Sequence, residues 1–181
     1  MKSLSLQGAF ADRIVFQEDP HATLLDGVPV AGVSHILNRC GIVETWDSPP
    51  GFAAMRGTYI HEAIAYHLRD ELDLDTLDDS IRGYFDAAMQ FLADTGLEPI
   101  YVEQPVVASR DLIFDGTASE HLVYGGNLDF FGRYSPSPGT VLTELVDWKS
   151  GQVGGERYQA QVGAYWKALR NTALQCGIPI A

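Results

Sequence analysis

The sequence predicts an α/β (α+β) fold in which a mixed central β-sheet is flanked by helices. Strand-like and helical patterns follow one another in a definite order: a hairpin near the N-terminus, helices, three strands and a final helix. The chain has 181 residues, of which 46% are hydrophobic, and this size suits one domain with its own core. We therefore expect a single domain over residues 1–181, with an N-terminal hairpin and short helix at 13–41 and a core at 52–176.

The N-terminal region combines turn signals with short apolar stretches. Asp26-Gly27 lies between two such stretches, and this dipeptide is a strong signal for a tight hairpin turn. Ser34 is placed to cap the short helix that follows, and Gly41 is placed to end it. Residues 44–52 contain two prolines and a glycine, so we expect a loop there.

Three further stretches space their apolar side chains three and four residues apart, which is typical of helices with one buried face. They span about 53–68, 81–95 and 156–176, and Gly96 ends the second. Six acidic residues lie between the first two, at 70–79. We interpret this run as a solvated loop and helix start, because the glycine that a calcium-binding loop needs at its sixth position is missing.

Three strand candidates follow the second helix. They span 100–108, 121–134 and 140–150, with turns expected at Gly116 and at 135–139. Asp147 and Lys149 lie two residues apart in the last of these strands, so strand alternation places both on one face, about 7 Å apart along the chain. If that strand pairs antiparallel with the preceding one, Asp129 lies beside Asp147 at the same end of the sheet.

Two neighbouring carboxylates repel each other, and a divalent cation is the simplest way to offset that cost. Lys149 would then be placed to face a phosphate or an attacking water, so the group resembles half of a metal site for phosphodiesters. Two plainer interpretations remain open. Asp147 could form a structural ion pair with Lys149 or share a site with Asp129 for stability alone, and His61 could be a hydrogen-bonded core histidine.

Five short motifs in order resemble the PD-(D/E)XK nuclease superfamily. They are RGTYIHE (56–62), Glu103 in YVEQP, GNLD (126–129), DWK (147–149) and QVGAY (161–165). The sequence is most similar to the RecB-like branch, which includes phage exonucleases, lambda-exonuclease-like enzymes and the mitochondrial genome maintenance exonuclease. The resemblance covers roughly residues 13 to 170 and also includes the stretch LDGVPVAGVSHIL near the N-terminus. Each motif is weak by itself, and the ordered set is specific.

The resemblance implies a restriction-endonuclease-like core and a metal-dependent deoxyribonuclease, with an exonuclease favoured over an endonuclease. It implies that Mg²⁺ or Mn²⁺, as one or two ions, is held by His61, Asp129, Asp147 and the carbonyl of Trp148. Lys149 would orient the attacking water and stabilise developing charge. The remaining implied roles are a second-metal ligand or structural anchor for Glu103, bracing or DNA contact for Gln161 and Tyr165, and a phosphate contact for Arg56.

Composition restricts partners and cofactors. The net charge of −12 is unfavourable for binding DNA, so we expect Arg56, Lys149 and Arg157 to gather near the site, with the acidic run elsewhere. Two cysteines cannot supply the four ligands of the iron–sulfur relatives, so no such cluster is expected. No apolar stretch approaches the length of a membrane span, and no signal peptide is evident.

The lack of a membrane span or signal peptide leads us to expect a cytoplasmic protein, and the resemblance to phage exonucleases implies a bacterium or a phage-infected host, in DNA recombination, repair or processing. The expected partners are single- or double-stranded DNA ends, together with a protein such as a recombination or single-strand-binding protein. The oligomeric state is left open. Two alternatives also remain: an endonuclease, or a non-catalytic nucleic-acid- or protein-binding module that kept the fold. The final residues, CGIPIA, resemble the start of another strand, which leaves open either a sequence truncated at this end or a protein completed by a partner.

Overall fold

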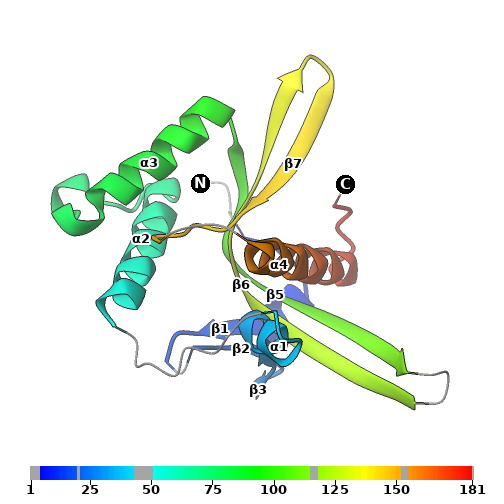
Figure 1. The fold of residues 1–181 in the computed structure, drawn as a ribbon. Helices are drawn as coiled ribbons and strands as arrows, with labels where there is room; N and C mark the ends of the chain where they lie inside the picture. The colour runs from blue at the N-terminus through cyan, green and yellow to red at the C-terminus, as the bar shows by residue number, and fades with distance from the viewer. Residues whose placement is uncertain (1–4, 20, 43–50, 115–117, 152–154, 181) are drawn as a thin grey trace. The chain divides into compact units, whose positions relative to one another are not determined.

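The structure is a computed structural model that describes residues 5–19, 21–42, 51–114, 118–151 and 155–180, without the side chains of 53 and 110–122. Helices flank a mixed sheet, as the sequence predicts (Figure 1). Strand β6 (Ala118–Ser137) pairs parallel with β4 (Ala31–Gly32) and antiparallel with β7 (Thr140–Val146). The sheet order is β4-β6-β5, with β5 spanning Glu98–Phe114. The mixed α and β class is therefore confirmed.

The chain folds into two compact units, each assembled from three segments. The first unit comprises Met1–Ser5, Trp46–Glu103 and Asp129–Val153, and the second comprises Leu6–Thr45, Gln104–Leu128 and Gly154–Ala181. Strands β5 and β6 run through both units, so neither unit is continuous in sequence. The expectation of a single domain over 1–181 stays a prediction.

In the second unit, the short helix η1 (Ala11–Arg13) leads into an antiparallel sheet. Its strands are β1 (Ile14–Gln17), β2 (Ala22–Leu25) and β3 (Val28–Pro29). Asp26 and Gly27 have φ values of 54° and 77°, the left-handed conformation that the two-residue turn between β2 and β3 requires. The predicted hairpin is confirmed.

Helix α1 (Val33–Arg39) ends as predicted but begins differently. Gly41 has a φ of 70°, which is the usual glycine conformation after a helix end. The predicted cap by Ser34 is wrong, because the N-cap position is Gly32, which makes no side-chain cap. Gly32 pairs with Gly125 of β6, so the strand pairing fixes the chain up to Gly32 and the helix starts directly after it.

Helix α4 (Glu156–Gln175) completes the second unit and contacts α1. Its buried residues are Ala168, Leu169, Thr172 and Ala173. The hydroxyl of Thr172 accepts from the amide of Val107 at 2.9 Å and donates to the Val107 carbonyl at 3.0 Å, which fixes the helix to β5. The described residues after the helix, 176–180, form a turn and an irregular segment where the sequence suggests a strand.

The first unit is built on α2 (Phe52–Leu68) and α3 (Asp79–Thr95), which pack side by side (Figure 1). Their shared core consists of Ile60, Ala63, Ile64, Leu77, Ile81, Phe85 and Ala88. The acidic run between them is exposed and contains the short helix η2 (Leu74–Thr76). Asp78 caps α3 by accepting from the amide of Ser80 at 2.7 Å, and Gly96 ends it with a φ of 66°.

The hairpin of β6 and β7 projects from the first unit (Figure 1). Its turn confirms the one predicted at 135–139, since Ser137 pairs with Thr140 across it. Strand β7 ends at Val146, four residues earlier than the sequence suggests. The predicted turn at Gly116 and most of the predicted loop at 44–52 lie outside the described residues. No helix in the described part of the chain is long and apolar enough to cross a membrane.

Candidate metal centre

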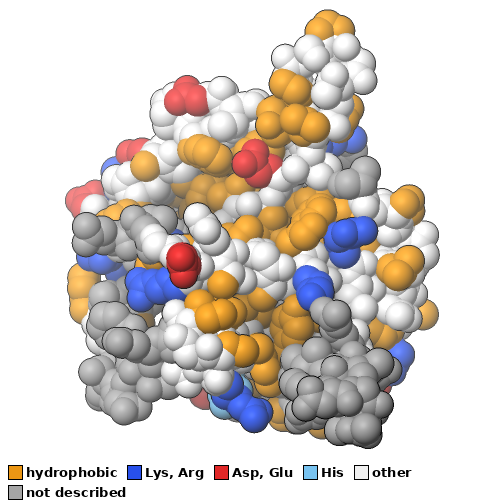
Figure 2. Space-filling model, turned by 45° about the vertical axis from the view of Figure 1, so that its right-hand side comes forward, with side chains coloured by type: hydrophobic (Ala, Val, Ile, Leu, Met, Phe, Trp, Pro, Cys, Tyr) orange, Lys and Arg blue, Asp and Glu red, His pale blue; other side chains and the backbone are white. Residues whose placement is uncertain are grey.

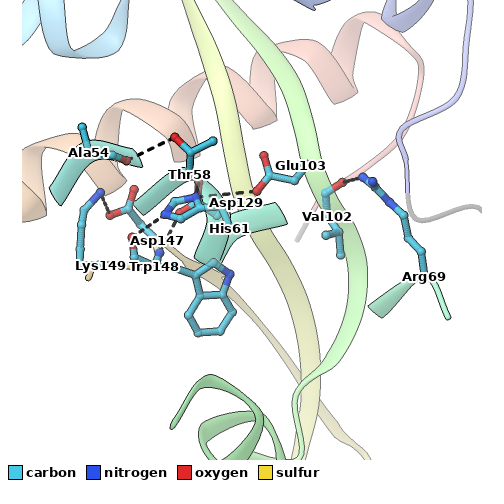
Figure 3. A network of polar contacts seen from close by, with 10 residues as sticks. All are labelled: Ala54, Thr58, His61, Arg69, Val102, Glu103, Asp129, Asp147, Trp148 and Lys149. Atoms are coloured by element: carbon cyan, nitrogen blue, oxygen red, sulfur yellow. Dashed lines mark hydrogen bonds and ion pairs between the residues drawn. The ribbon is translucent and has the colours of Figure 1, made fainter. Parts of the chain in front are cut away.

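Polar side chains from four elements of the first unit meet at one place (Figure 3). Helix α2 supplies His61, β5 supplies Glu103, β6 supplies Asp129, and the segment directly after β7 supplies residues 147–149. The Asp129 and Asp147 side chains are each only 8% exposed. Ionised carboxylates are rarely buried this deeply unless they have partners, so the partners are the informative feature.

The register of the sheet explains why the two aspartates meet. Phe130 of β6 pairs with Val146 of β7, so the next position along the hairpin brings Asp129 and Asp147 opposite each other. At that point the amide of Trp148 donates to Asp129 Oδ2 at 2.7 Å. The amide of Trp148 therefore donates to the Asp129 carboxylate rather than to a backbone carbonyl of β6, as it would in a continuing strand. For this reason β7 ends before the predicted boundary.

His61 is held by both of its ring nitrogens. Its Nε2 lies 3.0 Å from the carbonyl oxygen of Trp148, and because a carbonyl can only accept, Nε2 is the donor. Its Nδ1 lies 3.3 Å from Asp129 Oδ1 and 3.8 Å from Glu103 Oε1. Burial lowers the pKa of His61, but the hydrogen bond and charge of Asp129 and the charge of Glu103 outweigh it and raise the pKa to about 8. The ring is therefore an imidazolium at neutral pH.

The donor atoms of His61, Glu103 and Asp129 all lie within 4.8 Å of one another. A metal ion could replace the imidazolium proton there, since metal binding to histidine requires the neutral ring. The three carboxylates of the group, including Asp147, face one lysine and one protonated histidine, which leaves one negative charge uncompensated. A divalent cation in place of the proton would make the group neutral. The carboxylate oxygens fit Mg²⁺ and Mn²⁺, and the ring nitrogen fits Mn²⁺ better.

Glu103 belongs to this group although its implied role from sequence was uncertain. Its φ of 48° is unusual for a residue with a side chain, above all within a strand. The neighbouring Val102 is buried, and its carbonyl accepts from Arg69 Nη2 at 3.1 Å, which anchors the backbone beside Glu103. A strained backbone that its surroundings hold in place is common at functional sites.

Asp147 does not join the close trio of donor atoms among the described residues. Its Oδ2 lies 2.5 Å from Lys149 Nζ instead, so the two residues share a side even though the chain has left the strand there. Burial, and then the charge of Asp129, raise the pKa of Asp147, while Lys149 and His61 oppose the rise. The structure thus contains the ion pair that the plainer interpretation expects, and that pair borders the possible metal ligands.

Arg56, which was expected to contact a phosphate, contacts the protein here. Its Nη2 donates to the carbonyl of Ser150 at 3.0 Å, and its guanidinium lies 5.1 Å from the ring centre of Tyr84. It thereby connects α2 to the residue after Lys149. The phosphate contact stays a prediction.

Gln161 and Tyr165 lie on α4 in the second unit. Tyr165 explains one glycine of the GNLD motif, because a Cβ on Gly126 would lie 2.7 Å from its ring atom Cε1. Real side chains essentially never approach so closely, so the ring needs a glycine beneath it. The bracing or DNA-contacting role of both residues stays a prediction.

Sequence reasoning missed how the centre is supported. The indole of Trp148 packs against the apolar clusters of the first unit, although only its carbonyl was considered from sequence. The backbone anchor at Arg69 and the left-handed conformation of Glu103 also had no sequence signal, because each depends on contacts between distant segments.

In Figure 2, individual Lys and Arg side chains lie among apolar and uncharged groups on the face that is drawn. Within the first unit, Arg56 donates to the carbonyl of Ser150, the residue that follows Lys149 in the chain. Arg157 belongs to the second unit, so its place near the site stays a prediction.

Comparisons of the chain with protein families, with curated proteins and with solved structures found no match.

Proposed function

We propose that the chain is a metal-dependent deoxyribonuclease with a restriction-endonuclease-like core, most consistent with an exonuclease that processes DNA ends. The observation that carries the proposal is the convergence of His61, Glu103 and Asp129 from three separate elements, with the Asp147–Lys149 pair beside them. The ordered motifs that resemble RecB-like nucleases supply these same residues. Burying several carboxylates from distant segments in one place costs free energy. Such clusters occur mainly where a function requires them, which supports a catalytic or metal-binding role here.

Each residue of the centre has a role that follows from its position. His61, Glu103 and Asp129 would hold the ion, together with Asp147 or the carbonyl of Trp148 after a small rearrangement. A bound Mg²⁺ or Mn²⁺ supplies Lewis-acid activation of the phosphate and a more acidic bound water. The amine of Lys149 lies at the edge of the centre, where it can orient water and stabilise negative charge on phosphate oxygens. Asp147 holds that amine in place.

A non-catalytic module that kept the fold is the second candidate, and the net charge of −12 is the observation that favours it. DNA binding depends on neutralising phosphates with Lys and Arg, and the chain has 12 such residues against 24 acidic ones. Against it stands the presence of Asp129, Asp147 and Lys149 together, since a copy that had lost catalysis is expected to have lost at least one of the three.

Digestion of defined DNA substrates tests the proposal. Linear and circular DNA, each single- and double-stranded, are incubated with the protein and Mg²⁺, Mn²⁺ or EDTA. We expect cleavage with Mn²⁺ or Mg²⁺ that EDTA abolishes, and an exonuclease degrades the linear forms only. Cleavage of circular DNA would assign an endonuclease instead. Binding without cleavage under every metal condition would favour the non-catalytic module.

A matched pair of isosteric variants shows whether the centre is responsible. Asp129→Asn removes one ligand charge, and Asp86→Asn makes the same change at an exposed position of α3. We expect Asp129→Asn to lose at least about a hundredfold in rate, which corresponds to about 3 kcal/mol of lost stabilisation. Asp86→Asn should retain the wild-type rate. Equal rates for both variants would place the activity elsewhere.

A further inference from the structure

We propose that Trp148 is a positioning residue, whose indole holds its own backbone in the orientation that the metal centre needs. The consequence for metal binding rests on the proposed function, whereas the positioning itself does not. The indole contacts no polar group of the centre in Figure 3 and points away from it. Its effect is exerted through the peptide groups on either side of its Cα.

The indole is fixed by two aromatic rings. Its ring centre lies 6.1 Å from that of Phe91 at 85°, and 5.8 Å from that of Phe130 at 62°, both edge-to-face arrangements. The two rings form a slot that holds the indole. Phe130 is fully buried, so its ring cannot move aside easily. The indole also packs against the cores formed by α2 with α3 and by β5 with β6.

The same residue makes two backbone hydrogen bonds to the centre. Its amide donates to Asp129 Oδ2 at 2.7 Å, and its carbonyl accepts from His61 Nε2 at 3.0 Å. A rotation of this backbone would break both bonds at once. Residues 147–149 belong to no helix or strand in the described structure, so no ladder of hydrogen bonds fixes their conformation. The anchored indole supplies that constraint.

Core filling alone would account for a buried tryptophan, and the two roles predict different local effects. A residue that only fills the core affects the whole unit uniformly when it is truncated. A residue that positions its backbone affects the amide of residue 148 more than the amides of the neighbouring strand β7. Phe85→Leu is the control, because Phe85 lies in the same core and its ring makes an edge-to-face contact with His67 of α2.

Amide hydrogen exchange of the metal-free protein measures this difference. We expect Trp148→Ala to accelerate exchange at residue 148 about tenfold or more beyond any change in β7, because one hydrogen bond to a carboxylate is lost. Trp148→Phe should stay close to wild type, and Phe85→Leu should change both sites equally. Equal acceleration at residue 148 and in β7 for Trp148→Ala would overturn the proposal. If that variant does not fold, Phe91→Ala opens the slot from its partly exposed side and is expected to give the same local acceleration.

Titration with Mn²⁺ alone separates this proposal from the proposed function. We expect Trp148→Ala or Phe91→Ala to weaken Mn²⁺ binding about tenfold or more, as loss of groups that orient metal ligands usually does. Trp148→Phe and Phe85→Leu should bind like wild type. A wild-type protein that neither binds Mn²⁺ nor cuts DNA would refute the proposed function, while the exchange measurement would still decide the positioning role. Unchanged Mn²⁺ affinity in Trp148→Ala would refute the link between the two.

Discussion

Replacing Gly125 by alanine should destabilise the second unit, because the new methyl group has no room. A Cβ at Gly125 would lie 2.8 Å from the carbonyl oxygen of Val106 and 3.0 Å from side-chain carbons of Thr23 and Val107. The nearest of these atoms is backbone, so relief requires movement of a strand. Overpacking of this kind costs about 1–3 kcal/mol, and the lower chain entropy of alanine offsets roughly 0.5–1 kcal/mol. At the middle of both ranges the net loss is about 1 kcal/mol, which corresponds to a fall in Tm of about 2–4 °C.

Gly163→Ala is the matched control in the same unit. Gly163 lies within α4, is exposed, and has no atom within 4 Å of an added Cβ. Alanine is about 1 kcal/mol more favourable than glycine inside a helix, so this variant should be more stable than wild type. Urea unfolding followed by circular dichroism gives both free energies. A Gly125→Ala protein as stable as wild type would refute the close packing of β6 against β5 that the structure shows.

Two predictions concern pH. The hydrogen bonds with Ser80 lower the pKa of Asp78 in the folded protein. The stability that this cap of α3 contributes is therefore fully present above the unfolded-state pKa of about 4, and it is lost as the pH falls through the lower pKa of the folded protein. Asp78→Ala should therefore lower Tm at pH 7 and much less at pH 2, whereas Asp78→Asn should keep the cap at both. The raised pKa of His61, about 8, means that its ion pair stabilises the metal-free protein fully below about pH 6.5 and is lost as the pH rises through 8. The free energy of unfolding, measured from pH 6 to 9, should fall with rising pH in the wild type and not in His61→Gln. The same pH dependence in both proteins would contradict the raised pKa of His61.

The sequence predicted correctly the turns and helix ends that depend only on neighbouring residues. Asp26-Gly27 formed the hairpin turn, and Gly41 and Gly96 ended their helices, because a left-handed conformation is a property of the residue and its immediate neighbours. The signal at Ser34 failed because the pairing of Gly32 with a distant strand decided where α1 starts. Serine is a good cap, but tertiary structure selected the start.

In the candidate site, too, the features that depend on contacts between distant segments were not predicted from the sequence. The antiparallel pairing predicted from the sequence was enough to bring Asp129 near Asp147, since the register runs up to Phe130 opposite Val146, one position before them. Glu103 could not be assigned, because its left-handed backbone depends on the anchored Val102 and on Arg69 from another element. The end of β7 was missed for a related reason, since a side chain of β6 takes the amide hydrogen bond of Trp148.

The rate of DNA cleavage by Lys149→Ala, measured beside Mn²⁺ binding and Tm, tests the central claim most directly. Lys149 lies beside the possible metal ligands without being one, so its amine should act on charge that develops during the reaction. We predict a folded variant that binds Mn²⁺ within about threefold of wild type and cuts linear DNA at least about a hundredfold more slowly. Asp147→Ala should lose both cleavage and Mn²⁺ affinity. A folded Lys149→Ala protein that cuts DNA at the wild-type rate would contradict the account.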